Sequence, residues 1–282
     1  MLTFFFDRAD AMTIAQTTTA RLVEVFSAIQ GEGLNIGTRQ IFVRFALCDL
    51  RCFYCDSPQT WFAPASCRVE RTPGLRDFDN YPNPVSVEML SSWVERQNRP
   101  GLHESISITG GEPLLHAPFL SAFLPLVREK TKLPIYLETG GHRPQQLQLV
   151  LPYVDLVGMD IKLPSTSGET CWTEHEAFLK ACREADVSVF TKIVVCDRTP
   201  TQELERAAQL IRRIDRSIPV FLQPVTPLNG VLRGQNETLR KDAFRESVAP
   251  SPNLVLAWQT MMKRTLLDVR VIPQTHKMLG QL

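Results

Sequence analysis

The chain has 282 residues, 44% of them hydrophobic, and a formal net charge of +1. This length is enough for one large folded domain, whereas the near-neutral charge lacks the basic surface typical of nucleic-acid binding. No apolar run reaches the roughly 18 residues of a membrane span, so we expect neither a nucleic-acid partner nor a membrane segment. The seven cysteines fit a reducing compartment, where thiols hold metals rather than form disulfides, and we therefore expect a cytoplasmic protein.

The first third of the chain contains a cysteine motif, and the elements predicted around it are as follows in chain order. Residues 1–20 are polar and Thr-rich after the first few, which predicts a disordered extension ahead of a single domain at residues 21–282. Alternation at residues 21–27 predicts a strand that leads into the glycine-rich loop QGEG at residues 30–33, where the backbone can approach a ligand closely. A second strand is predicted at residues 41–46. Residues 63–84 are proline-rich without periodicity, so we expect an irregular excursion, after which Pro84 opens a helix.

Strand and helix patterns alternate through the rest of the chain. Predicted strands lie at residues 105–109, 135–138, 154–160, 189–195, 219–223 and 268–272, with helical patterns between them at residues 116–130, 144–150, 174–185 and 201–213. Such alternation predicts a parallel sheet with helical crossovers, either doubly wound or an open barrel. In both architectures ligands bind at the carboxyl ends of the strands.

The cysteine motif C-x3-C-x2-C follows the strand at residues 41–46 and consists of Cys48, Cys52 and Cys55. A short loop can direct three thiolates at one object, and thiolates select zinc or an iron–sulfur cluster. A closed cluster takes four cysteines, so three leave one iron open for a ligand, as in catalytic zinc sites. The simpler alternatives are a structural zinc site completed by Cys67, or buried cysteines that hold no metal.

With Tyr54 before its last cysteine, this motif resembles the signature of radical S-adenosylmethionine (SAM) enzymes. The resemblance implies a [4Fe–4S] cluster on Cys48, Cys52 and Cys55. It also implies that the open iron binds the methionine moiety of S-adenosylmethionine, with Tyr54 packed near the adenine.

Polar motifs recur where the later predicted strands end. TGGEP at residues 109–113 resembles the segment of radical SAM enzymes that contacts the methionine amino group. ETGG at residues 138–141 and DIKLPS at residues 160–165 are expected to reach the ribose and carboxylate of the cofactor. Taken alone, TGGEP is more simply explained as a tight turn between a strand and a helix, and Lys162 as a solvated lysine. The cofactor-binding residues expected at these strand ends are Gly111, Glu112, Glu138, Asp160, Ile161, Lys162 and Gln223.

Several segments together resemble the family of 7-carboxy-7-deazaguanine synthases over residues 23–277: IQGEG, FVRFALCDLRCFYCDS, ITGGEPLL, LETGGH, MDIKLPS, LQP and IPQTHK. The resemblance implies a partial (β/α)6-type TIM-like barrel, a homodimer and an electron donor such as flavodoxin or ferredoxin. The implied reaction is radical conversion of 6-carboxy-5,6,7,8-tetrahydropterin to 7-carboxy-7-deazaguanine with loss of ammonia. That reaction is a step toward queuosine.

The same resemblance places Arg44 against the carboxylate of the pterin. Arg44 interrupts an apolar strand four residues before Cys48, where a solvent-exposed charge is unexpected. Its planar guanidinium suits a carboxylate because it can bind both oxygens. The other residues that the resemblance places around the pterin are Ile29, Gln30, Gly31, Thr109 and His276.

The family also uses Mg2+, held by the substrate, by waters and by a hydroxyl just after the cysteine loop. Ser57 supplies that oxygen where threonine is usual, and a hydrated Mg2+ needs few protein ligands. Two alternatives stay open. One is a radical SAM activase that forms a glycyl radical on a partner protein, and the other is a non-catalytic zinc or iron–sulfur module. Residues 67–81 carry no motif that we can assign.

Overall fold

The computed structural model describes residues 19–226 and 248–280. Its main feature is a ten-stranded sheet in the order β12-β11-β10-β9-β8-β7-β3-β2-β4-β5. Neighbours from β3 to β12 run parallel, whereas β2 is antiparallel to β3 and β5 to β4. The strands of this sheet are β2 (Leu22–Ile29), β3 (Arg39–Phe45), β4 (Ser66–Glu70), β5 (Phe78–Pro82), β7 (Ser105–Gly110), β8 (Ile135–Thr139), β9 (Leu156–Asp160), β10 (Ser188–Val195), β11 (Val220–Pro224) and β12 (Val269–Val271).

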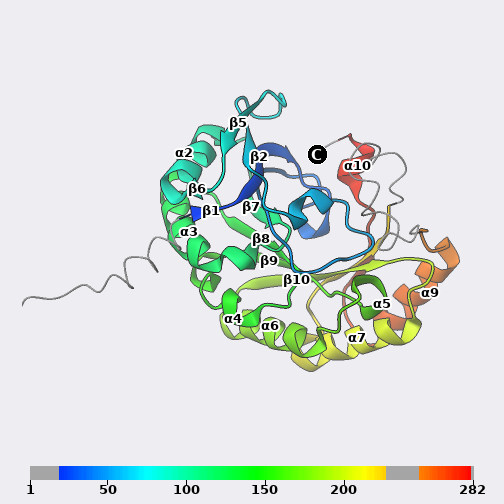
Figure 1. Ribbon diagram of the computed structural model, residues 1–282. Coiled ribbons are helices and arrows are strands. Elements are labelled where there is room, and N and C mark those ends of the chain that lie inside the picture. The colour runs from blue at the N-terminus through cyan, green and yellow to red at the C-terminus, as the bar shows by residue number, and fades with distance from the viewer. Residues whose placement is uncertain (1–18, 227–247, 281–282) are drawn as a thin grey trace, which may run out of the picture.

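The longer helices connect successive parallel strands and lie in an arc around the outside of the curved sheet (Figure 1). Each of these longer helices packs one apolar face on the sheet. In α7 (Thr201–Asp215), for example, Leu204, Ala207, Ala208 and Ile211 are buried on one side, and charged residues lie on the other. The helices are α2 (Val87–Gln97), α3 (Ala117–Thr131), α4 (Pro144–Leu147), α5 (Pro164–Ser167), α6 (Trp172–Glu184), α7 (Thr201–Asp215), α9 (Pro252–Lys263) and α10 (Thr275–Met278), with 3-10 turns η1 (Gly33–Asn35), η2 (Pro58–Trp61), η3 (Pro113–His116) and η4 (Leu151–Tyr153).

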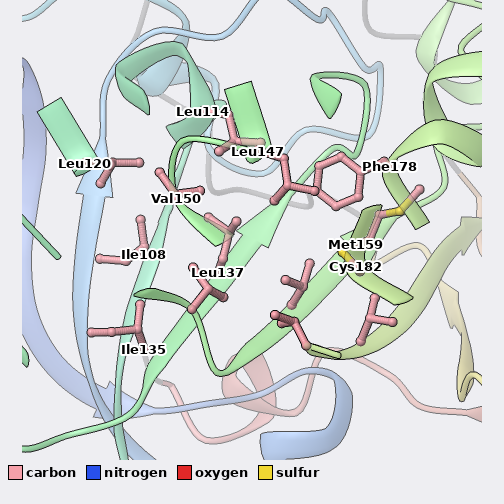
Figure 2. Packing of buried hydrophobic residues seen from close by; sticks show 14 of the residues in the cluster. Ile108, Leu114, Leu120, Ile135, Leu137, Leu147, Val150, Met159, Phe178 and Cys182 are labelled. Carbon is pink, nitrogen blue, oxygen red and sulfur yellow. The ribbon is translucent and has the colours of Figure 1, made fainter. Parts of the chain in front are cut away.

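One hydrophobic core lies between the sheet and these helices. Ile108, Leu137 and Met159 come from neighbouring strands and meet Leu120 and Phe178 of the helices α3 and α6 (Figure 2). The side chains are fully or almost fully buried. Burial of each large apolar side chain contributes roughly 1.5–3 kcal/mol to folding. This layer therefore stabilises the packing of the helices on the sheet.

The predicted strands and helical crossovers are confirmed, each within a few residues of its expected bounds. The sheet ends at β12 on one side and at β5 on the other. It is therefore an open, partial barrel, as the family resemblance implied. Among the described residues, no helix combines the length and the apolar character needed to cross a membrane.

Three expectations about the chain before residue 87 were wrong or incomplete. The excursion at residues 63–84 contains a β-hairpin, β4 and β5, which extends the sheet beyond β2. The helix α2 begins at Val87 rather than at Pro84, because the Ser86 side chain caps it by accepting from Met89 N at 3.2 Å. Of the expected N-terminal extension, residues 1–18 lie outside the described residues. Residues 19 and 20 form β1 (Thr19–Ala20), paired with β6 (Val85–Ser86).

Candidate functional site

A cavity of about 650 Å³ opens at the carboxyl ends of the parallel strands. The loops after β3, β7, β8 and β9 meet there with the QGEG loop after β2 and with the C-terminal helix α10. Ile161 is the predicted site residue that does not line the cavity, because its side chain lies in the hydrophobic core and is 1% exposed. The predicted residues that line it are Ile29, Gln30, Gly31, Arg44, Cys48, Cys52, Tyr54, Cys55, Ser57, Thr109, Gly111, Glu112, Glu138, Asp160, Lys162, Gln223 and His276.

The cysteine loop, residues 47–56, is held against the end of β7 by backbone hydrogen bonds. Glu112 N donates to Leu47 O at 2.9 Å, and Gly111 N donates to Phe45 O at 3.1 Å. A Cβ atom on Gly111 would lie 2.2 Å from Leu47 O and 2.9 Å from the Cβ of Cys48. Glycine is therefore required at position 111 for the loop to lie this close to β7.

Cys48, Cys52 and Cys55 line the cavity as free thiols. Burial raises the pKa of Cys48 to about 11 and that of Cys55 to about 12. Both thiols are therefore protonated at neutral pH until a metal displaces the protons. Cys67 lies in β4, 1% exposed in the hydrophobic core, and does not line the cavity. The donor set at the cavity is three thiols, which suits a cluster with one open iron better than a closed four-thiolate site.

No group of three or more His, Cys, Asp or Glu side chains in the described parts of the chain is arranged to hold one metal ion. A [4Fe–4S] cluster binds each cysteine through a different iron, so its ligands do not need to meet at one point. The cysteine loop therefore fits the cluster through the chemistry of its donors and its place on the cavity wall.

Glu112 is already hydrogen-bonded through both carboxylate oxygens. Its Oε1 accepts from Leu114 N at 3.0 Å and from Thr139 Oγ1 at 2.8 Å, and its Oε2 accepts from Gly140 N at 2.9 Å. A carboxylate can accept about four hydrogen bonds. Three of them fix Glu112 between the ends of β7 and β8, and the remaining capacity can accept from an ammonium group in the cavity.

Asp160, which also lines the cavity, lies between two lysines. Its oxygens are 2.6 Å from Lys162 Nζ and 3.1 Å from Lys192 Nζ. Burial raises the pKa of Asp160, but the two lysines outweigh that effect and hold the pKa below its usual range. Lys162 Nζ also lies 3.2 Å from the Tyr54 hydroxyl and 5.5 Å from the centre of its ring. These contacts fix Tyr54, which the resemblance places beside the adenine.

Glu138 lies beside the QGEG loop. Its Oε1 accepts from Gln30 Nε2 and from Ser107 Oγ, both at 2.8 Å. Burial raises the pKa of Glu138 in spite of the opposing effect of Lys192. A buried carboxyl group with a raised pKa can hold or release a proton closer to neutral pH, which makes Glu138 a candidate for proton transfer in the cavity.

Arg44 lines the cavity as part of an ion-pair cluster. Its Nε is 2.7 Å from Glu24 Oε1, and the other oxygen of Glu24 accepts from Arg68 Nε at 2.7 Å. Burial raises the pKa of Glu24, but the two arginines outweigh it and hold the pKa below its usual range. The Glu24 bond uses Nε of Arg44, so within the described part of the chain the two terminal nitrogens remain as donors for a further carboxylate.

Ser57 lies beside a further carboxylate, Asp56, that is paired with a lysine. Its Oγ donates to Asp56 Oδ1 at 3.1 Å, and Asp56 Oδ2 is 2.9 Å from both Lys277 Nζ and Gln274 Nε2. Burial raises the pKa of Asp56, but Lys277 and the hydrogen bonds hold it well below its usual range. The Ser57 hydroxyl and the Asp56 carboxylate are thus two adjacent oxygen donors of the kind that a hard cation prefers.

The helix α10 closes the cavity against the QGEG loop. Thr275 N donates to Gly31 O at 3.1 Å. A Cβ atom on Gly31 would lie 2.2 Å from Nδ1 of His276, so only glycine allows this close packing. Burial lowers the pKa of His276, which keeps its ring neutral at neutral pH.

Sequence reasoning missed the charged partners that complete these pairs. Glu24 and Lys192 each interrupt an apolar strand, which is the signal that selected Arg44. Glu32 and Asp56 lie inside motifs that we had singled out for other residues. The missed residues that line the cavity and form these ion pairs and hydrogen bonds are Glu24, Glu32, Asp56, Arg68, Lys192, Gln274 and Lys277.

Comparison with known proteins gives concordant matches. The family model of the Radical SAM superfamily matches residues 43–211. The chain is 45% identical to a 7-carboxy-7-deazaguanine synthase of Geobacter sulfurreducens, over 93% of this chain and 98% of that protein. It is 35% identical to a protein of the same name from Thermococcus kodakarensis, over 73% of this chain and 84% of that protein. The crystal structure of QueE from Escherichia coli shares the fold, with a TM-score of 0.54 at 20% identity over 91% of this chain and 94% of that one.

Proposed function

This chain belongs to the family of 7-carboxy-7-deazaguanine synthases within the radical SAM superfamily, and from that membership we propose that it converts 6-carboxy-5,6,7,8-tetrahydropterin to 7-carboxy-7-deazaguanine. The reaction releases ammonia and contracts one ring. Product and ammonia together contain all the atoms of the substrate, so the reaction needs no net oxidant. The observation that carries the proposal is the cavity, which brings the cysteine loop and the Arg44 cluster to one space.

The enzyme uses a [4Fe–4S] cluster and S-adenosylmethionine, as its superfamily does. Cys48, Cys52 and Cys55 would hold the cluster, and Glu112 and the backbone around Gly111 would receive the methionine moiety. When bound, these groups supply the one-electron chemistry that removes a hydrogen atom from the substrate. The protein positions the ligands, excludes water and places Glu138 where a proton can be exchanged.

Arg44 and Gln30 support the choice of a carboxylated pterin. The free terminal nitrogens of Arg44 suit a carboxylate, and the amide of Gln30 lies on the same wall beside Glu138. Thr109 at the end of β7 and His276 on α10 complete the surroundings of a flat ring with several hydrogen-bonding atoms. A glycyl-radical activase would act on a protein chain and would have no use for these groups.

We further propose that Mg2+ binds at the Ser57 hydroxyl. The adjacent Asp56 carboxylate supports this assignment because it can hold the metal directly or through a water. We also propose that the enzyme is a cytoplasmic homodimer and takes its electron from a flavodoxin- or ferredoxin-type donor. Its seven free cysteines support a reducing compartment.

The test is an anaerobic turnover assay. Protein reconstituted with iron and sulfide is reduced with dithionite and incubated with S-adenosylmethionine, Mg2+ and the carboxytetrahydropterin. We expect deazapurine absorbance to develop, with ammonia released in equal amount. Cleavage of S-adenosylmethionine without any deazapurine would contradict the proposed substrate, and a lack of cofactor binding would favour the non-catalytic metal module.

A further inference from the structure

The hairpin of β4 and β5 carries a residue of the cavity wall. Residues 67–81 had no assigned role, but β4 pairs with β2 in register at Glu24 and Arg68. Alternation along β4 buries Cys67 and Val69 in the core and turns Arg68 to the other face of the sheet, where it lines the cavity. The hairpin therefore adds one cationic side chain to the site.

Glu24 joins Arg68 to Arg44 through one oxygen each. The guanidinium of Arg44 lies 5.6 Å from the centre of the Phe26 ring, and that of Arg68 lies 4.5 Å from the centre of the Phe78 ring. Such stacking restricts the orientation of a guanidinium plane. Glu24 is 4% exposed, Arg44 15% and Arg68 42%, so the cluster runs from the core to the mouth of the cavity.

The charge of this cluster differs from that of the rest of the wall. Among the described residues, six carboxylates line the cavity against five lysines and arginines, which disfavours an anionic ligand. Elsewhere the cations are matched: Lys277 pairs with Asp56, while Lys162 and Lys192 pair with Asp160 and Glu32. At Glu24, two arginines share one carboxylate, which leaves one excess positive charge. Without Arg68, Arg44 and Glu24 would form a neutral pair.

We propose that Arg68 determines substrate specificity by supplying the excess positive charge that lets the Arg44 cluster accept a carboxylate. The inference rests on the proposed function and names a second residue for the same substituent. Arg44 makes the directed contact through its free nitrogens, and Arg68 offsets the negative charge of Glu24. The chain thereby prefers pterins that carry a carboxylate over uncharged pterins.

The test compares Arg68→Gln, which keeps a side-chain donor for Glu24 but removes the charge, with Arg68→Lys, which keeps the charge. Arg71→Gln is the matched control, because Arg71 follows β4, is 59% exposed and pairs with Asp77 and Asp79 away from the cavity. The readouts are kcat and KM for the carboxytetrahydropterin, and the inhibition constant of a tetrahydropterin without the carboxylate.

We expect Arg68→Gln to raise KM about tenfold, equivalent to about 1.4 kcal/mol, with kcat nearly unchanged. The inhibition constant of the uncharged pterin should stay at its wild-type value, Arg68→Lys should restore most of the lost affinity, and Arg71→Gln should match the wild type. An unchanged KM in Arg68→Gln overturns the inference. So does an equal weakening of both ligands, because that would show a structural role. Absence of wild-type turnover would instead contradict the proposed function.

Discussion

The cysteine side of the cavity, residues 47–56 with residues 110–112, differs from the arginine side, formed by Glu24, Arg44 and Arg68. The cysteine side comes from one short loop packed on a glycine turn, and burial raises the pKa of Cys48 and Cys55 so that these two thiols are protonated at neutral pH. The arginine side comes from three strands, and its charges are already paired with one another. One side thus needs a cofactor to complete it, whereas the other is organised before any ligand arrives.

Loss of a thiol should have the largest effect on activity. This effect should arise on the cysteine side alone. Replacing Cys48, Cys52 or Cys55 with Ala should abolish cleavage of S-adenosylmethionine, because three thiolates are the minimum for an open-iron cluster. The measurement is iron content after anaerobic reconstitution, with about four irons expected in the wild type. Cys67→Ala is the control and should retain the cluster, since Cys67 lies in the core. Loss of iron in that variant would restore a four-cysteine site.

Arg44→Ala should weaken use of the pterin, which the arginine side binds, without affecting the cysteine side. In this variant the carboxylate of the bound pterin would lose its buried partner. Such a loss costs about 2–5 kcal/mol, which corresponds to a decrease of roughly 30-fold to several-thousand-fold in kcat/KM for the pterin. Arg44→Lys should also be impaired, because an ammonium cannot bind both oxygens of a carboxylate. Cleavage of S-adenosylmethionine in the absence of pterin should continue nearly unchanged. Equal pterin affinity in wild type and Arg44→Ala would remove Arg44 from the site.

Ser57 directly follows the cysteine loop. We expect Ser57→Ala to have an intermediate effect on turnover. Removing the hydroxyl should lower turnover about tenfold and weaken its dependence on Mg2+, because a hydrated Mg2+ loses one of few protein ligands. Turnover measured across a Mg2+ titration checks this, and iron content should not change. A wild-type enzyme that is indifferent to chelators would rule out the metal assignment.

Glu24→Gln should have the smallest of the four main effects, a loss of folding stability that depends on pH. The folded-state pKa of Glu24 lies below the ordinary value of 4.5, so the ionised carboxylate stabilises the fold fully above that pH. This stabilisation is lost as the pH falls through the lowered pKa. At about pH 7 we expect the variant to be less stable by about 1.5–3 kcal/mol, and the difference should shrink as the pH falls below 4.5 and through the lowered pKa. Glu95→Gln, on an exposed pair with Lys130, should change stability by less than about 1 kcal/mol. A difference that grows at low pH would contradict the assigned shift.

The two sides also differ in how far the sequence predicts them. The cysteine loop is local, so spacing alone grouped Cys48, Cys52 and Cys55, whereas the glycines of residues 110–111 were assigned to this side through the family resemblance. The arginine side depends on pairs that are 20 and 44 residues apart, and Arg44 was recognised without its partner Glu24. Arg68 was missed because its five-residue strand pairs with an edge strand that ends in Pro82, and such strands lack a clear period.

The most direct test of the account is hydrogen transfer between the two ligands in one cavity. A carboxytetrahydropterin deuterated on its saturated ring carbons is incubated anaerobically with reduced, cluster-replete wild-type enzyme and S-adenosylmethionine. The recovered S-adenosylmethionine is then examined by mass spectrometry, because the family resemblance implies that the product radical takes a hydrogen back and the cofactor is regenerated. We expect deuterium at its 5′ carbon in the wild type, and at least about 30-fold slower incorporation in Arg44→Ala at the same substrate concentration, well below its raised KM. Deazapurine formation without deuterium transfer would contradict the placement of cofactor and substrate in the same cavity.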